Sequence, residues 1–265
     1  MIQHVTRVDD PRIGDFADVG HPDRLRANGR FVAEGRLVVR RLIESGRFPI
    51  ESVVFTPAAL NQLEDVLGGG NVPVRVCAPE LLRQITGFNF HRGCLALARR
   101  PSAQPPLEQF VGARRLLALE GIGNPDNMGG LFRVAAAFGS AGVVLGPACA
   151  DPFYRKTIRT SMGAVLGVPF TTAARWPGDL ERVRAAGTLI VALTPDTRAT
   201  PLRDLAAELD LDARLALIVG AEGPGLTQDA LRAADRLARI PMSPGVDSLN
   251  VTVAAGIALA FLDRR

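Results

Sequence analysis

Two glycine-rich segments each contain an isolated charge with apolar residues around it, the arrangement expected where a protein binds a polar ligand. In the first loop, 120–139, Arg133 is the only charged residue from position 128 onward. In the second, 215–227, Glu222 is the single charge beside three glycines. An isolated charge is costly to bury unless it meets a carboxylate, backbone carbonyls or a bound ligand. Both residues are therefore candidates for ligand binding or charge stabilisation, and the alternatives are an Arg tied to nearby backbone and a purely structural turn.

A third loop precedes an almost wholly apolar helix within residues 240–262. Asp247, Ser248 and Asn250 stand at the head of this helix. Capping needs only one of the three, so the others are free for binding. The first two loops follow predicted strands, and open α/β sheets bind small molecules at strand ends. The glycine spacing matches neither G-x-G-x-x-G nor a P-loop, which argues against a nucleotide-dependent oxidoreductase.

The elements that would position these loops alternate between strand and helix along the second half of the chain. A helix apolar on nearly all sides, such as the one predicted to carry Arg133, should be largely buried, with Asp126 or Asn127 as its N-cap. Near-continuous apolar strands separated by helices predict a parallel sheet covered on both faces. The predicted strands are 116–119, 143–145, 189–193 and 215–219, and the predicted helices are 128–138, 154–161, 202–208, 228–234 and one that begins at 249.

The first half of the chain shows a similar alternation, typical of a small α/β domain. Residues 99–108 contain three prolines and no periodic pattern, so they predict a linker. We expect one domain at 1–105, with the linker at its end, and a second domain at 106–265. The predicted helices of the first half are 31–45, 57–67 and 79–86, and its predicted strands are 52–55, 72–76 and 94–98.

Composition excludes several classes of protein. The 265 residues are 47% hydrophobic and 22% charged with a net charge of +4, as in a soluble globular chain that tolerates a polyanionic partner. Cys77, Cys94 and Cys149 are too few and too far apart for a disulfide framework or a metal site. The most apolar stretch, 251–262, is too short to span a bilayer, so no membrane partner and a cytoplasmic location are expected.

The three loops, in this order and spacing, resemble the motifs of the SpoU (TrmH-type) RNA ribose 2′-O-methyltransferases of the SPOUT superfamily. The first motif, Asn-x-Gly-x-x-x-Arg, is present as Asn127, Gly129 and Arg133. The second is G-x-E-x-x-G from position 220, and the third is IPM at 240–242 followed by SLNV at 248–251. The resemblance covers about residues 114–262.

This resemblance implies a parallel-sheet domain with a trefoil knot, a homodimer, and S-adenosylmethionine held by main-chain groups at Gly220, Ile240 and Leu249. The reaction implied is methyl transfer to a ribose 2′-hydroxyl of RNA, with ribosomal RNA favoured over transfer RNA and no metal required. Arg133 would stabilise the developing alkoxide, because a guanidinium with a pKa above about 12 is a poor proton acceptor. The residues expected to orient Arg133, the ribose or the cofactor are Asn127, Glu222, Ser248 and Asn250.

The N-terminal part resembles, more weakly, the small α/β/α substrate-binding domain that many members share with kink-turn-binding ribosomal proteins. RNA phosphates would be bound there by basic residues. A second basic cluster, Arg155, Lys156 and Arg159, is open to the same interpretation or to that of a solvated surface. The alternative function is a catalytically silent RNA-binding protein that keeps the knot for dimerisation. The proposed RNA-binding residues are Arg24, Arg26, Arg30, Arg36, His91 and Arg92.

Overall fold

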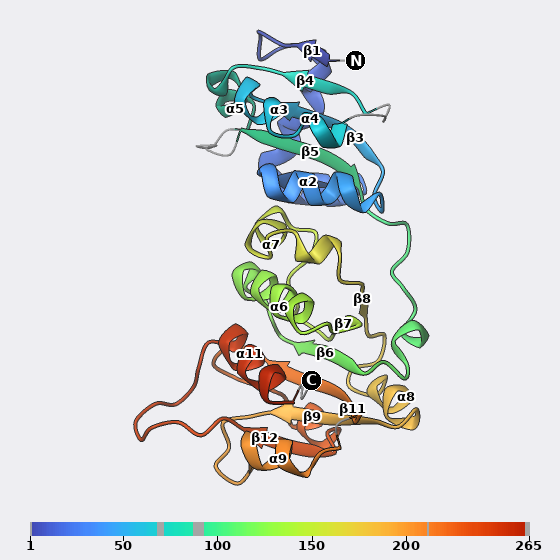
Figure 1. The fold of residues 1–265 in the computed structure, drawn as a ribbon, viewed down its shortest axis with the longest axis vertical. Coiled ribbons are helices and arrows are strands. Elements are labelled where there is room, and N and C mark those ends of the chain that lie inside the picture. Colours follow the sequence, from blue (N-terminus) through green and yellow to red (C-terminus); the bar gives the residue numbers. More distant parts are fainter. Residues whose placement is uncertain (1, 68–71, 87–92, 211, 263–265) are drawn as a thin grey trace. The chain divides into compact units, whose positions relative to one another are not determined.

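The computed structural model describes residues 2–67, 72–86, 93–210 and 212–262. The chain divides into two compact units (Figure 1). Unit 1 contains residues 1–103 and 151–167, and unit 2 contains residues 104–150 and 168–265. The sequence analysis placed 151–167 with the second domain, whereas here this segment packs with the first. His91 and Arg92 lie outside the described residues.

Unit 1 is built on a mixed five-stranded sheet in the order β1-β4-β3-β5-β2. Strand β5 is antiparallel to both β2 and β3, whereas β4 is parallel to β3 and to β1. The strands are β1 (Ile2–His4), β2 (Arg30–Glu34), β3 (Ile50–Phe55), β4 (Val74–Val76) and β5 (Cys94–Arg99). The helices and 3-10 helices are η1 (Pro11–Gly20), α1 (Pro22–Ala27), α2 (Arg36–Ser45), α3 (Pro57–Asn61), α4 (Glu64–Leu67), α5 (Pro79–Thr86), α7 (Arg155–Thr160) and η3 (Ala164–Leu166).

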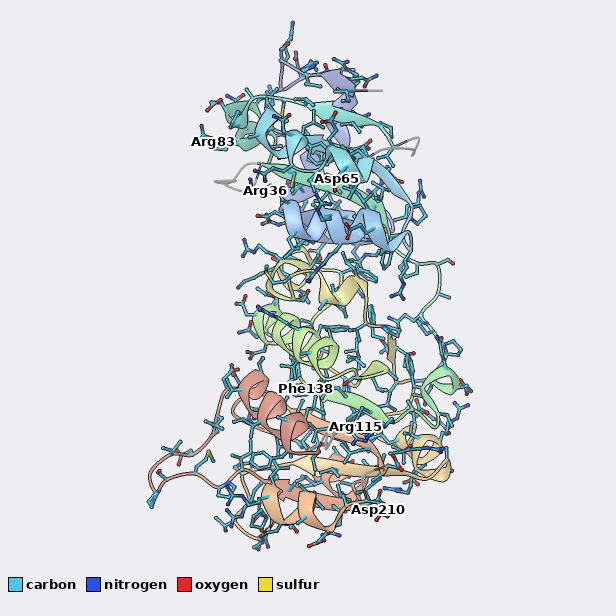
Figure 2. All side chains as sticks on the ribbon, viewed as in Figure 1. Arg36, Asp65, Arg83, Arg115, Phe138 and Asp210 are labelled. Carbon is cyan, nitrogen blue, oxygen red and sulfur yellow. The ribbon has the colours of Figure 1, made fainter. Side chains whose placement is uncertain are left out.

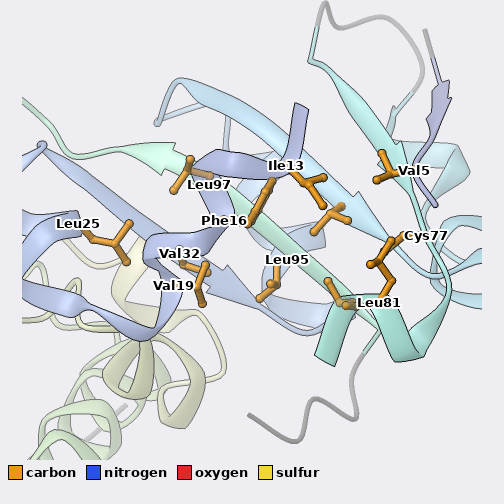
Figure 3. Packing of buried hydrophobic residues seen from close by; sticks show 12 residues of the cluster. Val5, Ile13, Phe16, Val19, Leu25, Val32, Cys77, Leu81, Leu95 and Leu97 are labelled. Atoms are coloured by element: carbon orange, nitrogen blue, oxygen red, sulfur yellow. The ribbon is translucent and has the colours of Figure 1, made fainter. Parts of the chain in front are cut away.

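The core of unit 1 lies between this sheet and the N-terminal helices. Phe16, Leu95 and Leu97 are fully buried in one apolar cluster (Figure 3). The fully buried Leu82 belongs to the same cluster. Burial of each such side chain contributes about 1.5–3 kcal/mol to the stability of the unit.

The expected helix 31–45 is wrong in its first part. Residues 30–34 form β2, a buried strand that pairs with β5, and only α2 is helical. Gly35 has a φ of 94°, which ends the strand and turns the chain into α2. A short apolar run is compatible with a buried strand or a buried helix, so periodicity could not separate them. The expected helix 57–67 is likewise divided, into α3 and α4.

Strand β2 carries Glu34, a buried carboxylate that is 5% exposed. Arg155 Nη1 of α7 lies 2.9 Å from its Oε2, and Arg159 Nη1 lies 3.9 Å from its Oε1. The expected second basic cluster is therefore partly neutralised within unit 1. The ion pair between Glu34 and Arg155 connects the 151–167 segment to the five-stranded sheet.

We expect Glu34→Gln to lower the free energy of unfolding by about 2 kcal/mol, because hydrogen bonds to charged groups contribute about 1.5–3 kcal/mol. Chemical denaturation followed by circular dichroism measures this change. Glu80→Gln is the matched control, since Glu80 pairs with Arg83 on an exposed surface and should cost at most about 1 kcal/mol. Equal losses in the two variants would contradict the assigned role of Glu34.

Unit 2 contains a seven-stranded sheet in the order β10-β12-β9-β11-β6-β7-β8, and every pair of neighbours is parallel. The expected parallel sheet is thus confirmed. Its strands are β6 (Arg115–Glu120), β7 (Gly142–Leu145), β8 (Phe170–Thr172), β9 (Thr188–Leu193), β10 (Thr200–Pro201), β11 (Arg214–Gly220) and β12 (Arg236–Arg239). Its helices are η2 (Leu107–Phe110), α6 (Pro125–Ala137), α8 (Leu180–Ala185), α9 (Leu202–Glu208), α10 (Gln228–Arg232) and α11 (Val251–Leu262).

Helices α6 and α11 lie against one another (Figure 1). Gly130 allows this close approach, because a Cβ atom there would lie 2.6 Å from Thr252 Oγ1. The two helices carry the first and third motifs, so their packing brings those motifs together. Among the described residues, no helix combines the length and apolar character needed to cross a bilayer.

Candidate active site

A cavity of about 450 Å³ opens among the loops that follow β9, β11 and β12. These loops stand at the carboxyl ends of parallel strands, where open α/β sheets place their ligand sites. The volume falls within the ~300–1,000 Å³ typical of small-molecule and cofactor sites. The lining residues are Leu193, Thr194, Pro195, Val219, Gly220, Ala221, Glu222, Gly223, Gly225, Ile240, Met242, Asp247, Ser248, Leu249, Val251 and Ala254.

The loop of residues 220–227, which follows β11, forms one wall of this cavity. It folds back so closely that a Cβ atom on Gly220 would lie 2.5 Å from the carbonyl carbon of Gly225. Gly225 N donates a hydrogen bond to Ala221 O at 3.1 Å, and the φ values of Gly223 and Gly225 are 89° and 71°. Left-handed backbone of this kind favours glycine. The glycines of the second motif are therefore required by the shape of the wall.

Asn250 joins the three motif loops. Its Nδ2 donates to Asn127 Oδ1 at 2.9 Å and to Glu222 Oε1 at 2.7 Å. Its Oδ1 accepts from the backbone N–H groups of Thr252 and Val253 at 3.0 and 3.3 Å, so Asn250 is the residue that caps α11. One side chain thus fixes the start of α11 and holds an amide and a carboxylate at the edge of the cavity.

The N-cap of α6 differs from the prediction. Asn124 occupies that position, with its side chain accepting from Asp126 N at 2.8 Å. Pro125 follows at the first helical position, where a missing N–H costs nothing. Asn127 therefore lies inside the first turn, is 8% exposed, and directs its side chain to Asn250.

Arg133 does not line the cavity, and its side chain is exposed although it belongs to a mostly apolar helix. Glu222 lines the cavity and Arg133 does not, so the two isolated charges do not face one shared cavity within this chain. Leu131, Phe132 and Ala135 supply the buried side of α6. This orientation of the helix leaves Arg133 exposed together with Ala136 and Ala137. No hydrogen bond or ion pair joins Arg133 to another described residue.

The other candidate residues lie where the loops converge. Gly220, Ile240 and Leu249 all line the cavity, and so do Glu222 and Ser248. Glu222 and Asp247 are the only charged side chains among the lining residues, so the cavity wall carries two carboxylates and no cation. The sequence analysis did not identify Leu193, Thr194 and Pro195, although their position after an apolar strand pointed to this edge of the sheet.

Cysteine nucleophiles are not indicated. Burial raises the pKa of the Cys77 thiol to about 11, and burial also raises the pKa of Cys149 above its ordinary value. A thiol with a raised pKa is a poor nucleophile at neutral pH. Across the described ranges, no group of three or more His, Cys, Asp or Glu side chains is arranged to hold a metal ion.

A model of the SpoU rRNA Methylase family matches residues 114–260, which contain β6, α6, the 220–227 loop and most of α11. The chain belongs to this family. It is 42% identical over 267 residues to an uncharacterized tRNA/rRNA methyltransferase of Mycobacterium bovis, with 99% of this chain and 91% of the relative covered. It is also 34% identical to the 23S rRNA (guanosine-2′-O-)-methyltransferase RlmB of a Burkholderia species, over 67% of this chain and 72% of the relative.

Solved structures agree with this assignment to the SpoU family. The AdoMet-bound rRNA methyltransferase from Sinorhizobium meliloti matches with a TM-score of 0.83 and 25% identity, over 99% of this chain and 98% of the other. A structure described as an RNA 2′-O ribose methyltransferase matches with a TM-score of 0.78 and 26% identity, over 99% and 98% of the two chains. Both likenesses extend over unit 1 as well as unit 2.

In this SpoU family member, the proposed RNA-binding arginines of unit 1 fall into two groups. Arg24 lies 3.5 Å from Asp18, and Arg30 pairs with Asp15 and Glu51 at 3.2 and 2.7 Å. Arg26 and Arg36 are exposed and make no ion pair with any described residue. Arg36 is labelled in Figure 2. Because their charge is not compensated, Arg26 and Arg36 are the better candidates for phosphate contacts.

We expect Asn250→Ala to lower the free energy of unfolding of this SpoU methylase by about 1–2 kcal/mol. The variant removes an N-cap and leaves Asn127 and Glu222 without a shared donor. Asn250→Ser retains a capping hydroxyl and should recover about half of the loss. Differential scanning calorimetry measures both, and an alanine variant as stable as the wild type would contradict the role given to Asn250.

Proposed function

We propose that this protein transfers a methyl group from S-adenosylmethionine to a ribose 2′-hydroxyl of RNA. The observation that carries the proposal is the bridge from Asn250 to Asn127 and Glu222, which gathers the polar groups of three motifs at the edge of one cofactor-sized cavity. Membership of the SpoU rRNA methylase family supplies the reaction class. Its RlmB relative, a guanosine-2′-O-methyltransferase of 23S rRNA, favours the ribose hydroxyl over a base atom.

S-adenosylmethionine is the cofactor, and the cavity fits it chemically. The apolar side chains of Leu193, Ile240 and Leu249 suit an adenine ring, while Gly220 leaves backbone groups open to close approach. The carboxylates of Glu222 and Asp247 suit a ligand with a positively charged sulfonium and ammonium. When bound, the cofactor supplies a methyl group activated by the sulfonium.

The chain's own residues would orient the hydroxyl and stabilise negative charge on it. Arg133 is an exposed residue of α6, six positions after Asn127. Helical side chains lean toward the N-terminus of their helix, so the Arg133 guanidinium extends toward the end of α6 where Asn127 lies. In this proposal Arg133 stabilises the developing alkoxide, and water or an RNA phosphate accepts the proton of the 2′-hydroxyl.

The remaining parts of the proposal concern assembly and substrate. The C-terminal segment of unit 2 would form a trefoil knot around the cofactor loops, and two copies would pair through their knotted units. Unit 1 would be the RNA-binding domain, with Arg26 and Arg36 on phosphates. The favoured substrate is ribosomal RNA in the cytoplasm, because the named RlmB relative acts on 23S rRNA.

Nucleoside mass spectrometry of ribosomal and transfer RNA from a deletion strain tests this function. We expect one 2′-O-methylnucleoside to be lost and to be restored by the purified protein with S-adenosylmethionine. A complete set of ribose methylations in the deletion strain would overturn the proposal. Calorimetry separates the alternative, because a catalytically silent RNA-binding protein would bind RNA without binding S-adenosylmethionine.

A further inference from the structure

Glu120, the last residue of β6, is a buried carboxylate on which three donors converge. Its side chain is 4% exposed. Its Oε1 accepts from Trp176 Nε1 at 2.6 Å and from Thr227 Oγ1 at 2.8 Å, and its Oε2 accepts from Thr227 N at 2.8 Å. Hydrogen bonds to a charged acceptor in a poorly solvated place are about twice as strong as neutral ones. This network therefore holds Thr227 and Trp176 firmly to the Glu120 carboxylate.

Thr227, which donates two of these hydrogen bonds, is the last residue of the 220–227 loop that forms a wall of the cavity. Thr227 Oγ1 also accepts from Ala230 N at 3.2 Å, so it is the N-cap of α10. At the other end of the loop, Gly220 is in register with Glu120 across the β11–β6 pair. Glu120 thus lies beside the residue where the loop begins and binds the residue where it ends.

Two further close approaches surround the Glu120 network, one to the loop and one to Trp176. Gly121, next to Glu120, has a φ of 70°, and a Cβ atom on it would lie 3.1 Å from Ala221 Cβ. The indole of Trp176 packs over Gly146, where a Cβ atom would lie 2.7 Å from Trp176 Cδ2. Trp176 therefore fixes Glu120 from one side, while Glu120 fixes the loop.

We propose that Glu120 is a positioning residue for cofactor binding: it sets the 220–227 loop so that Gly220, Glu222 and Gly225 present a preformed wall to the ligand. This inference rests on the proposed function, since it concerns the same cavity. Glu120 does not line the cavity itself, so it acts only through Thr227. A loop held in its binding conformation before the ligand arrives loses less conformational entropy on binding.

Glu120→Gln is the sharpest test, because it keeps the size of the side chain. An amide has one acceptor oxygen, so its NH2 group must face either the Thr227 N–H or the indole N–H. We expect the affinity for S-adenosylmethionine, measured by calorimetry, to fall about tenfold, as for the loss of about 1.4 kcal/mol. Amide hydrogen exchange at 221–227 should become faster in the free protein.

Asp235→Asn is the matched control. Asp235 also accepts a hydrogen bond from a backbone N–H, that of Ile190 at 2.8 Å. However, it lies at the amino end of β12, whereas the cavity lies at the carboxyl ends of the strands. We expect this variant to keep wild-type affinity for the cofactor and wild-type exchange at 221–227. Trp176 is the sole tryptophan of the chain, so its fluorescence should change in Glu120→Gln and not in Asp235→Asn.

The outcomes separate the inference from the proposed function. If the wild type does not bind S-adenosylmethionine, the proposed function fails, while loop exchange in the free protein still tests whether Glu120 holds the loop. If Glu120→Gln matches Asp235→Asn in affinity and loop exchange, the inference is overturned. If Glu120→Gln does not fold, two variants of Thr227 provide the test. We expect Thr227→Val to weaken cofactor binding several-fold and Thr227→Ser to stay within twofold of the wild type. Equal affinities of these two variants would overturn the inference.

Discussion

Replacing Arg133 by alanine is expected to lower the rate of methyl transfer about 10²- to 10³-fold, the usual cost of removing one donor that stabilises a developing oxyanion. Affinity for S-adenosylmethionine should stay within twofold of the wild type, because Arg133 does not line the cavity. Stability should change little, since the side chain is exposed. Single-turnover methylation of the RNA substrate, with calorimetry of cofactor binding, measures the two effects separately.

Arg203→Ala is the control for this experiment. Arg203 is an exposed arginine of α9 in the same unit, so its loss removes the same charge from a surface without an assigned role. Its variant should methylate RNA at the wild-type rate. Wild-type turnover by Arg133→Ala with intact cofactor binding would remove Arg133 from the mechanism, and a loss of cofactor affinity would mean that it acts on the cofactor instead.

The motif loops could be predicted from the sequence because their chemistry is local. Glycines at the end of an apolar strand and a polar cluster before an apolar helix both mark backbone that a ligand can approach, and Gly220, Glu222 and Leu249 do line one cavity. The direction in which Arg133 points was not predictable. It depends on which face of α6 packs against α11, and the near-uniform apolar sequence of α6 does not encode that choice.

Other features depend on partners distant in the chain. The role of Glu120 in holding the 220–227 loop could not be predicted from the sequence. A single acidic residue at a strand end acquires this role only when Trp176 and Thr227 fold against it. The strands β8, β10 and β12 have two to four residues each, too few for a periodic pattern. Residues 31–34 were misassigned as helix because their burial comes from pairing with β5.

Gly220→Ala tests the geometry of the cavity wall at its tightest point. The added Cβ atom would lie 2.5 Å from the carbonyl carbon of Gly225, 2.6 Å from the nitrogen of Leu226 and 2.7 Å from the oxygen of Gly225. All three are backbone atoms, so no side chain can turn away and the 220–227 loop itself must move. Overpacking of this kind costs about 1–3 kcal/mol.

We expect this strain to lower the affinity for S-adenosylmethionine about 10- to 100-fold, since 1.4 kcal/mol corresponds to a factor of ten. Calorimetry measures the affinity, and thermal unfolding reports whether the fold is retained. Gly123→Ala is the matched control: it adds the same methyl group in the same unit, where its nearest neighbour would be Ala148 O at 3.7 Å, an ordinary contact. If both variants bind the cofactor as tightly as the wild type, the close approach of Gly220 to Gly225 does not shape the binding site.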